Sequence, residues 1–146
     1  MNDEGAFWDS SSLVPLCLFE QSTSLARAFL KQWRPTVWWA TPVEISGAIA
    51  RRVRERRLNE SQVDGALEAL DALAGHWEMV RPADTLRESA QRLVRRHDLR
   101  AADALQLAAA IQWRGAGTER IVFISGDMRL LTAAQASGFQ VMSTAK

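Results

Sequence analysis

Four carboxylates in the sequence stand where proteins with parallel sheets do chemistry. Asp9 and Asp127 each follow a short apolar run that reads as a buried strand. Glu44 and Asp103 each fall near the start of a predicted helix. In an open parallel sheet, ligands bind beyond the carboxyl ends of the strands, so these acids are expected to converge at one edge.

Each of these acids also has a simpler explanation when taken singly. A carboxylate in the first turn of a helix interacts favourably with the helix dipole, which would account for Glu44 and Asp127. Asp103 is harder to explain in this way, because it is surrounded in sequence by alanine and leucine. An unpaired charge in such surroundings is costly, so a cation or strong hydrogen-bond donors are expected beside it.

Convergence of the four acids would create a conflict that a metal ion resolves. Neighbouring carboxylates repel and raise the pKa of one another. Hard oxygen ligands suit Mg²⁺, with Mn²⁺ as a possible substitute, and a substrate phosphate can complete the coordination shell. Such an ion activates water and neutralises a phosphodiester. The pattern therefore indicates metal-assisted phosphodiester hydrolysis.

The elements that would position these acids alternate along the chain. Strands are predicted at residues 6–8, 37–40, 77–80, 121–124 and 139–142. Helices are predicted at 25–33, from 41, from 59 to a stop at Gly75, from 82, at 99–113 and at 127–137. This alternation predicts an α/β fold with a mostly parallel sheet covered by helices on both faces, in one domain spanning residues 1–146.

Two of these helices carry start signals. Thr41 offers a side-chain oxygen as an N-cap, and Pro42 suits the first helical position. Asn59 with Gln62 three residues later predicts a capping box.

Composition narrows the class of protein. The 146 residues are 47% apolar and 24% charged with a net charge of +1, which disfavours a polybasic nucleic-acid tail. One cysteine and two histidines exclude a disulfide within the chain and the usual zinc sites. The acidic start predicts no signal peptide, and no apolar run is long enough to span a membrane. We therefore expect a cytoplasmic protein without a membrane segment.

Four segments resemble those of PIN-domain ribonucleases, and of VapC toxins among them. The segments are FWDSS (7–11), TPVE (41–44), LRAADALQLA (99–108) and FISGD (123–127), in the order of that family. The resemblance implies a three-layer α/β/α PIN-like fold with a five-stranded parallel sheet and an acidic Mg²⁺ site that cuts RNA. It also implies a cognate antitoxin as partner and a homodimer.

The resemblance also implies a role for each matching residue. Asp9 and Asp103 would be the principal metal ligands, Glu44 would complete the site or hold a metal-bound water, and Asp127 would be the fourth acid. Small hydroxyl side chains usually hydrogen-bond the carboxylates, and the matching positions are Ser10 and Ser125.

Other residues admit two interpretations. Arg96 and Arg100 lead toward Asp103 and are weak candidates for RNA binding, whereas the arginines between 51 and 57 suit either a solvated helix end or a contact with RNA or antitoxin. The tryptophans fall mostly on apolar faces, which predicts core or subunit interface.

The sequence leaves two alternatives to a nuclease. The first is a non-catalytic module of the same fold that binds RNA or a partner protein. The second, a response-regulator receiver, is disfavoured because no lysine follows the later strands before Lys146 and no acidic pair stands beside Asp9.

Overall fold

The computed structural model describes residues 4–117 and 120–145, and its centre is a five-stranded parallel sheet. The strand order is β3-β2-β1-β4-β5, with every neighbouring pair parallel. The strands are β1 (Gly5–Trp8), β2 (Arg34–Trp38), β3 (Glu78–Val80), β4 (Val122–Ser125) and β5 (Gln140–Ser143). The predicted parallel sheet is confirmed.

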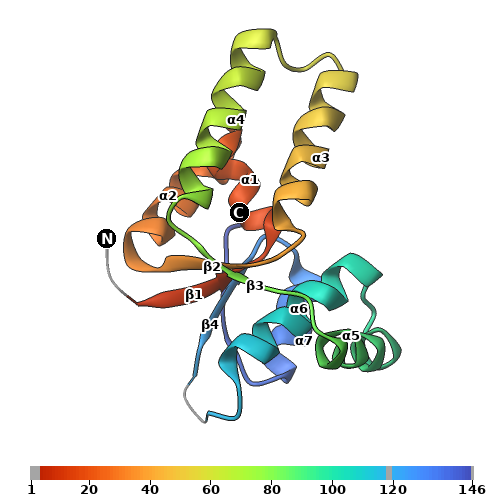
Figure 1. Ribbon diagram of the computed structural model, residues 1–146. Coiled ribbons are helices and arrows are strands. Elements are labelled where there is room, and N and C mark those ends of the chain that lie inside the picture. The colour runs from red at the N-terminus through yellow and green to blue at the C-terminus, as the bar shows by residue number, and fades with distance from the viewer. Residues whose placement is uncertain (1–3, 118–119, 146) are drawn as a thin grey trace.

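Helices cover both faces of this sheet, which completes the three layers (Figure 1). One face packs against α1 (Ser10–Cys17), α2 (Thr23–Gln32), α3 (Thr41–Arg54) and α4 (Glu60–Ala74). The other packs against α5 (Asp84–Arg96), α6 (Ala101–Arg114) and α7 (Met128–Ala136). None of the described helices combines the length and apolarity needed to cross a bilayer.

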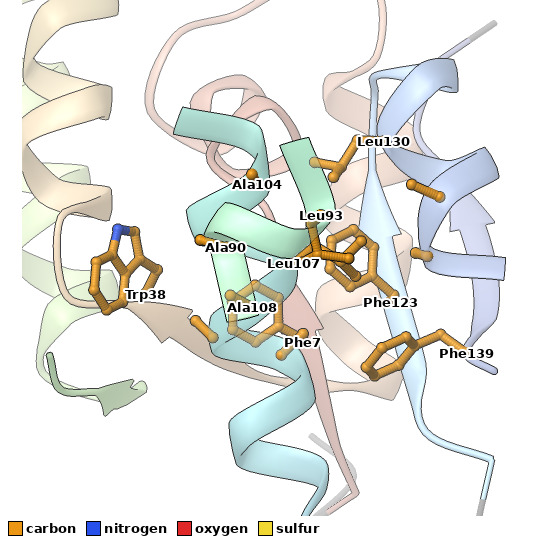
Figure 2. Packing of buried hydrophobic residues seen from close by; sticks show 14 of the residues in the cluster. Phe7, Trp38, Ala90, Leu93, Ala104, Leu107, Ala108, Phe123, Leu130 and Phe139 are labelled. Atoms are coloured by element: carbon orange, nitrogen blue, oxygen red, sulfur yellow. The ribbon is translucent and has the colours of Figure 1, made fainter. Parts of the chain in front are cut away.

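The alternation of side chains along the strands explains why two layers of helices are needed. Ala6 and Trp8 of β1 pack toward α1, α3 and α4, whereas Phe7 between them packs toward α5, α6 and α7. On the side of α5, α6 and α7, Phe7 stacks on Phe123 of β4 with ring centroids 5.4 Å apart (Figure 2). A parallel strand that is apolar on both faces has to be covered on both.

Two local predictions are wrong. The strand predicted at 37–40 is β2, which begins earlier because Arg34 already pairs with Gly5 of β1, and it ends before Trp39. A further helix, α1, follows β1 immediately, where no helix is specifically predicted. Its eight residues include Pro15, and the serine run at its start gives little helical periodicity to read.

The sheet order creates a switch point beside β1. The chain runs outward from β1 through β2 to β3, then returns to the other side of β1 for β4 and β5. The carboxyl ends of β1 and β4 therefore flank the place where connections diverge, which is where ligands bind in such sheets. Asp9 follows β1 at this point, and Asp127 lies two residues beyond the end of β4.

Candidate active site

Asp9 is the most buried acid of the site, with 4% of its surface exposed. Its Oδ2 accepts hydrogen bonds from the hydroxyls of Ser11 and Ser125, the second at 2.8 Å. Burial raises the pKa of Asp9, the two hydroxyls oppose that rise, and the nearby charge of Glu44 adds to it. Asp9 is thus held by hydroxyl groups, and the ion pairs of residues 4–117 and 120–145 do not include it.

Glu44 lies in the first turn of α3, as predicted, and is held by a second set of donors. Its Oε1 accepts from Ser10 Oγ at 2.9 Å and from Gln106 Nε2 at 2.6 Å. Burial raises the pKa of Glu44, these donors lower it, and the charge of Asp103 raises it again. Glu44 and Asp9 therefore share an arrangement in which neutral groups fix a carboxylate.

Two neighbouring serines divide these tasks between them. Ser10 and Ser11 are consecutive in the first turn of α1, where each residue is rotated by about 100° from the last. Ser10 accordingly reaches Glu44, whereas Ser11 reaches Asp9 and also accepts from the backbone N–H of Gly126 at 2.9 Å. The Asp-Ser-Ser sequence thus supplies one carboxylate and one hydroxyl for each of two acids.

The loop after Ser125 packs closely at Gly126, where a side chain would be crowded. A Cβ at Gly126 would lie 3.1 Å from Thr144 Oγ1 and 3.5 Å from Ser11 Oγ. Ser125 in turn accepts from the backbone N–H of Asp127 at 2.9 Å, which ties the loop after β4 to Asp9. The loop and α1 are therefore locked together around the buried acid.

Gln106 is a site residue that the sequence analysis did not single out. It lies on α6 with no exposed surface, and its Nε2 also approaches Ser10 Oγ at 2.8 Å and Thr41 Oγ1 at 3.3 Å. Its Oε1 is buried without a hydrogen-bond partner among the described residues. One sequence signal could have identified Gln106: its helix is predicted to be packed on several sides. An amide side chain buried in such a helix needs polar partners.

The predicted capping role of Thr41 is wrong. The N-cap of α3 is Ala40, and no side chain caps this end, although Pro42 does occupy the first turn. Thr41 is instead fully buried, with its hydroxyl directed at Gln106. A cap signal and a buried site residue look alike in sequence, because both place a hydroxyl beside a helix start.

Asp103 and Asp127 face a common hollow of about 440 Å³. The pKa of Asp103 is raised to about 6, mainly by burial and also by the charges of Asp9 and Asp127, while Arg100 opposes the rise. Asp127 is the N-cap of α7, since its Oδ1 accepts from the backbone N–H groups of Arg129 and Leu130. Asp127 therefore has the ordinary helix-start role as well as a place beside Asp103.

Only one of the two arginines predicted to bind RNA, Arg100, lines this hollow. Arg100 and Arg129 line the hollow with Asp103 and Asp127, whereas Arg96 is not among its lining residues. Arg129 also forms an exposed ion pair with Asp98 at 3.5 Å. Within the described residues, the ion pairs use other carboxylates than the four site acids; their acidic members are Glu20, Glu55, Glu78, Asp84 and Asp98.

The site offers the right donors for a hard cation, but not a finished coordination group. Within residues 4–117 and 120–145, no three His, Cys, Asp or Glu side chains stand together as a group that could hold a metal ion. The acids nevertheless act on one another's pKa as far as Asp127. The side-chain donors converge on one oxygen of each carboxylate, Oδ2 of Asp9 and Oε1 of Glu44, and the backbone N–H of Ser11 also lowers the pKa of Asp9. Carboxylate oxygens of this kind are ligands that Mg²⁺ and Mn²⁺ prefer.

Two curated proteins are similar to this chain in sequence. The chain is 32% identical over 140 residues to two Mycobacterium tuberculosis proteins, ribonuclease VapC45 of strain CDC 1551 and ribonuclease VapC49 of strain H37Rv. In both cases the match covers 92% of this chain and 92% of the relative. No protein-family model matches the chain.

Solved structures share the fold at lower sequence identity. A toxin–antitoxin complex from Klebsiella pneumoniae contains a chain that matches with a TM-score of 0.66 and 17% identity, covering 97% of this chain and 99% of that one. A crystal structure of a Pyrobaculum aerophilum protein matches with a TM-score of 0.65 and 17% identity, covering 94% and 89% respectively.

Proposed function

The chain belongs to the VapC ribonuclease family, and from that premise we propose that it hydrolyses RNA phosphodiester bonds as the toxin of a toxin–antitoxin pair. One observation carries the proposal. Asp9 after β1, Glu44 of α3 and Asp103 of α6 lie near enough at the carboxyl edge of the sheet for the charge of each to raise the pKa of another. A protein gains nothing for folding from such repulsion, so its retention points to a functional site.

The proposed cofactor is Mg²⁺, with Mn²⁺ as a possible substitute. Asp9, Glu44, Asp103 and Asp127 would hold it. When bound, such an ion supplies a Lewis acid that offsets the charge of the phosphodiester and lowers the pKa of water. Oxygen donors without sulfur or imidazole support this class of cation over zinc.

The surrounding side chains then have defined tasks. Ser11 and Ser125 donate to one oxygen of Asp9, Oδ2, and Ser10 and Gln106 donate to one oxygen of Glu44, Oε1. Geometry is thereby fixed before the substrate arrives, which is the main contribution that protein groups make in phosphoryl chemistry.

Two arginines in the wall of the hollow that holds Asp103 and Asp127 would contact the RNA backbone. Arg100 and Arg129 lie beside Asp103 and Asp127 and can contact phosphate oxygens. Arg96 is exposed at the end of α5 and is a weaker candidate than either of them.

The proposed partners are a cognate antitoxin and a second copy of the chain. The Klebsiella pneumoniae structure, which is a toxin–antitoxin complex, supports the first. The proposed RNA substrate would be met in the cytoplasm, a compartment that also suits a chain with a single cysteine. Gel filtration at micromolar concentration tests the dimer, and a monomer would contradict it.

The decisive experiment is RNA cleavage by the purified protein with Mg²⁺, compared with the same reaction in EDTA. We expect cleavage only with the ion, and its loss in Asp9→Asn, which keeps the hydroxyl contacts of the native side chain. Asp64→Asn, on the exposed face of α4, is the matched control and should cleave normally. Full activity of Asp9→Asn would refute the proposal.

Metal binding measured by calorimetry separates the nuclease from the alternative of a non-catalytic module. Binding of Mg²⁺ or Mn²⁺ that Asp9→Asn weakens supports the nuclease. A folded protein that binds neither ion, even beside RNA, fits only the non-catalytic module.

A further inference from the structure

A second hollow, of about 300 Å³, is lined largely by apolar side chains and shares one element, α6, with the acidic site. Trp38 and Trp39 at the end of β2 form one wall, and Pro82 and Ala83, just before α5, form another. Leu105 of α6 also lines it. We call this the Trp39 hollow; its volume is at the lower end of the range for small-ligand sites.

Trp39 stands out among the aromatic side chains because half of its surface, 50%, is exposed. Trp38, its neighbour in sequence, is only 6% exposed and meets it edge to face with ring centroids 6.4 Å apart. Trp39 is therefore not a core residue, and its predicted alternative place in a subunit interface stays a prediction. Trp38 belongs to the core (Figure 2), and its ring contact with Trp39 anchors one side of that indole.

The Trp39 hollow and the acidic site are adjacent along two shared stretches of chain. Trp39 lies two residues before the start of α3, which carries Glu44 in its first turn. Leu105 lies two residues after Asp103 on α6. Asp103 and Leu105 point to nearly opposite sides of α6, so the two hollows flank the start of this helix, and a nucleotide near the phosphate that reaches the acids is the candidate occupant of the Trp39 hollow.

We propose that the Trp39 hollow binds an unpaired nucleobase of the RNA, stacked on the indole of Trp39, beside the phosphodiester that is cleaved. This inference rests on the proposed ribonuclease function and adds to it a base-binding subsite. Stacking of bases on aromatic side chains is the common way to hold single strands, and it tolerates many sequences.

Charge at the rim favours a nucleic acid over a second copy of this chain as the occupant. Arg87 lines the hollow, and Arg81 is exposed in the loop that leads into it. Arg87 is paired with Asp84 at 3.1 Å, but both side chains are largely exposed, so the guanidinium remains free to meet a phosphate. Asp84 also lines the hollow, so two arginines face one carboxylate at its rim, and an apolar floor with this net positive rim suits a base with its backbone.

The test compares a labelled single-stranded oligonucleotide with an abasic strand of the same length, by fluorescence anisotropy in EDTA so that no cleavage occurs. The wild type should bind the base-containing strand tighter by about 10-fold or more. Trp39→Ala should lose this preference, and Trp39→Phe should keep most of it. Phe19→Ala, which removes another exposed aromatic outside the hollow, is the matched control and should change nothing.

A second variant probes the opposite wall and leaves Trp39 in place. Ala83→Leu adds bulk at an exposed position with extended backbone, so the fold should tolerate it. It should also abolish the preference for bases. If both variants fold, as circular dichroism would show, and keep the wild-type preference, the inference is refuted.

The outcomes separate this inference from the proposed function. If the wild type cleaves no RNA but its preference for bases depends on Trp39, the subsite stands and the nuclease proposal fails. If the wild type cleaves RNA and Trp39→Ala keeps the preference, only the subsite fails. If Trp39→Ala converts a dimer to a monomer with the preference unchanged, Trp39 contacts a second copy and the inference is overturned.

Discussion

Replacing Asp103 with asparagine is expected to stabilise the protein and inactivate it at the same time. In the folded state Asp103 lies close to Asp9 and Asp127 in a half-buried position, and its pKa is raised to about 6 from a usual 3.8. At neutral pH the folded protein therefore carries an unfavourable charge that the unfolded chain does not feel. Asparagine has nearly the same shape and removes that charge.

The size of the effect follows from the pKa shift. Each unit corresponds to about 1.4 kcal/mol, so the shift of Asp103 would amount to about 3 kcal/mol if it were fully expressed. Solvent screening of a half-buried group and the lost attraction to Arg100 reduce this, and we expect a gain of about 1–2 kcal/mol at pH 7.5. For a domain of this size that raises the midpoint of thermal unfolding by roughly 3–6 °C.

The sign of the pH dependence makes the prediction specific. Because the pKa of Asp103 is higher in the folded state, that state binds protons more readily between about pH 4 and pH 6. The wild type therefore loses this part of its stability as pH rises through that window. The advantage of Asp103→Asn should be complete above pH 6 and should become small near pH 4, where the carboxyl is largely protonated in the folded state.

Thermal and urea unfolding in EDTA at pH 4 and pH 7.5 measure this directly, with RNA cleavage assayed in parallel. Asp64→Asn removes an equal charge from the exposed face of α4 and should change stability by less than about 0.5 kcal/mol. If Asp103→Asn is no more stable than the wild type at pH 7.5, or gains equally at pH 4, burial and repulsion of the Asp103 charge do not destabilise the folded protein. Retained cleavage would refute the assigned role of Asp103.

Three further predictions concern residues that hold the site or the fold. Gln106→Leu removes a donor from Glu44 and should lower kcat about 10- to 100-fold, with KM and the circular dichroism spectrum little changed; an unaltered kcat would show that Glu44 needs no such support. Asn59→Ala breaks a complete capping box and should cost about 1 kcal/mol in urea unfolding without affecting cleavage, so a drop in cleavage would contradict the assignment. Leu107→Ala empties a fully buried position and should cost about 2–5 kcal/mol, which a loss of less than about 1 kcal/mol would rule out.

The sequence predicts structure correctly where the local pattern and the tertiary packing favour the same element. The capping box of Asn59 and Gln62 is present as predicted, because both partners lie within one helical turn and need nothing else from the fold. The stop at Gly75 follows the same logic, since α4 ends at Ala74. The parallel sheet was also predictable, because strands that are apolar on both faces have to be covered by helices on both.

Prediction failed where a residue's role depends on a partner far away in sequence. Thr41 carries the signature of a cap, but its hydroxyl is used by Gln106, 65 positions later. Ser11 serves the site as Ser10 does, yet the sequence indicates only Ser10, because which acid each one reaches depends on how α1 leaves β1. Trp39 looks like core because its apolar neighbours are core, and only the placement of α5 shows that it is half exposed.

The choice of supporting groups explains how the acids can be both fixed and available. Asp9 and Glu44 are held by hydroxyl and amide donors, which supply direction but no net charge. An arginine in the same place would hold a carboxylate as firmly, but it would also neutralise the field that attracts a cation. Uncharged donors do not neutralise the negative charge of the acids. The pKa values of Asp9, Glu44 and Asp103 remain raised. The ion pairs of the described residues leave out the four site acids, so the proposed cation would not have to displace a charged side chain from them.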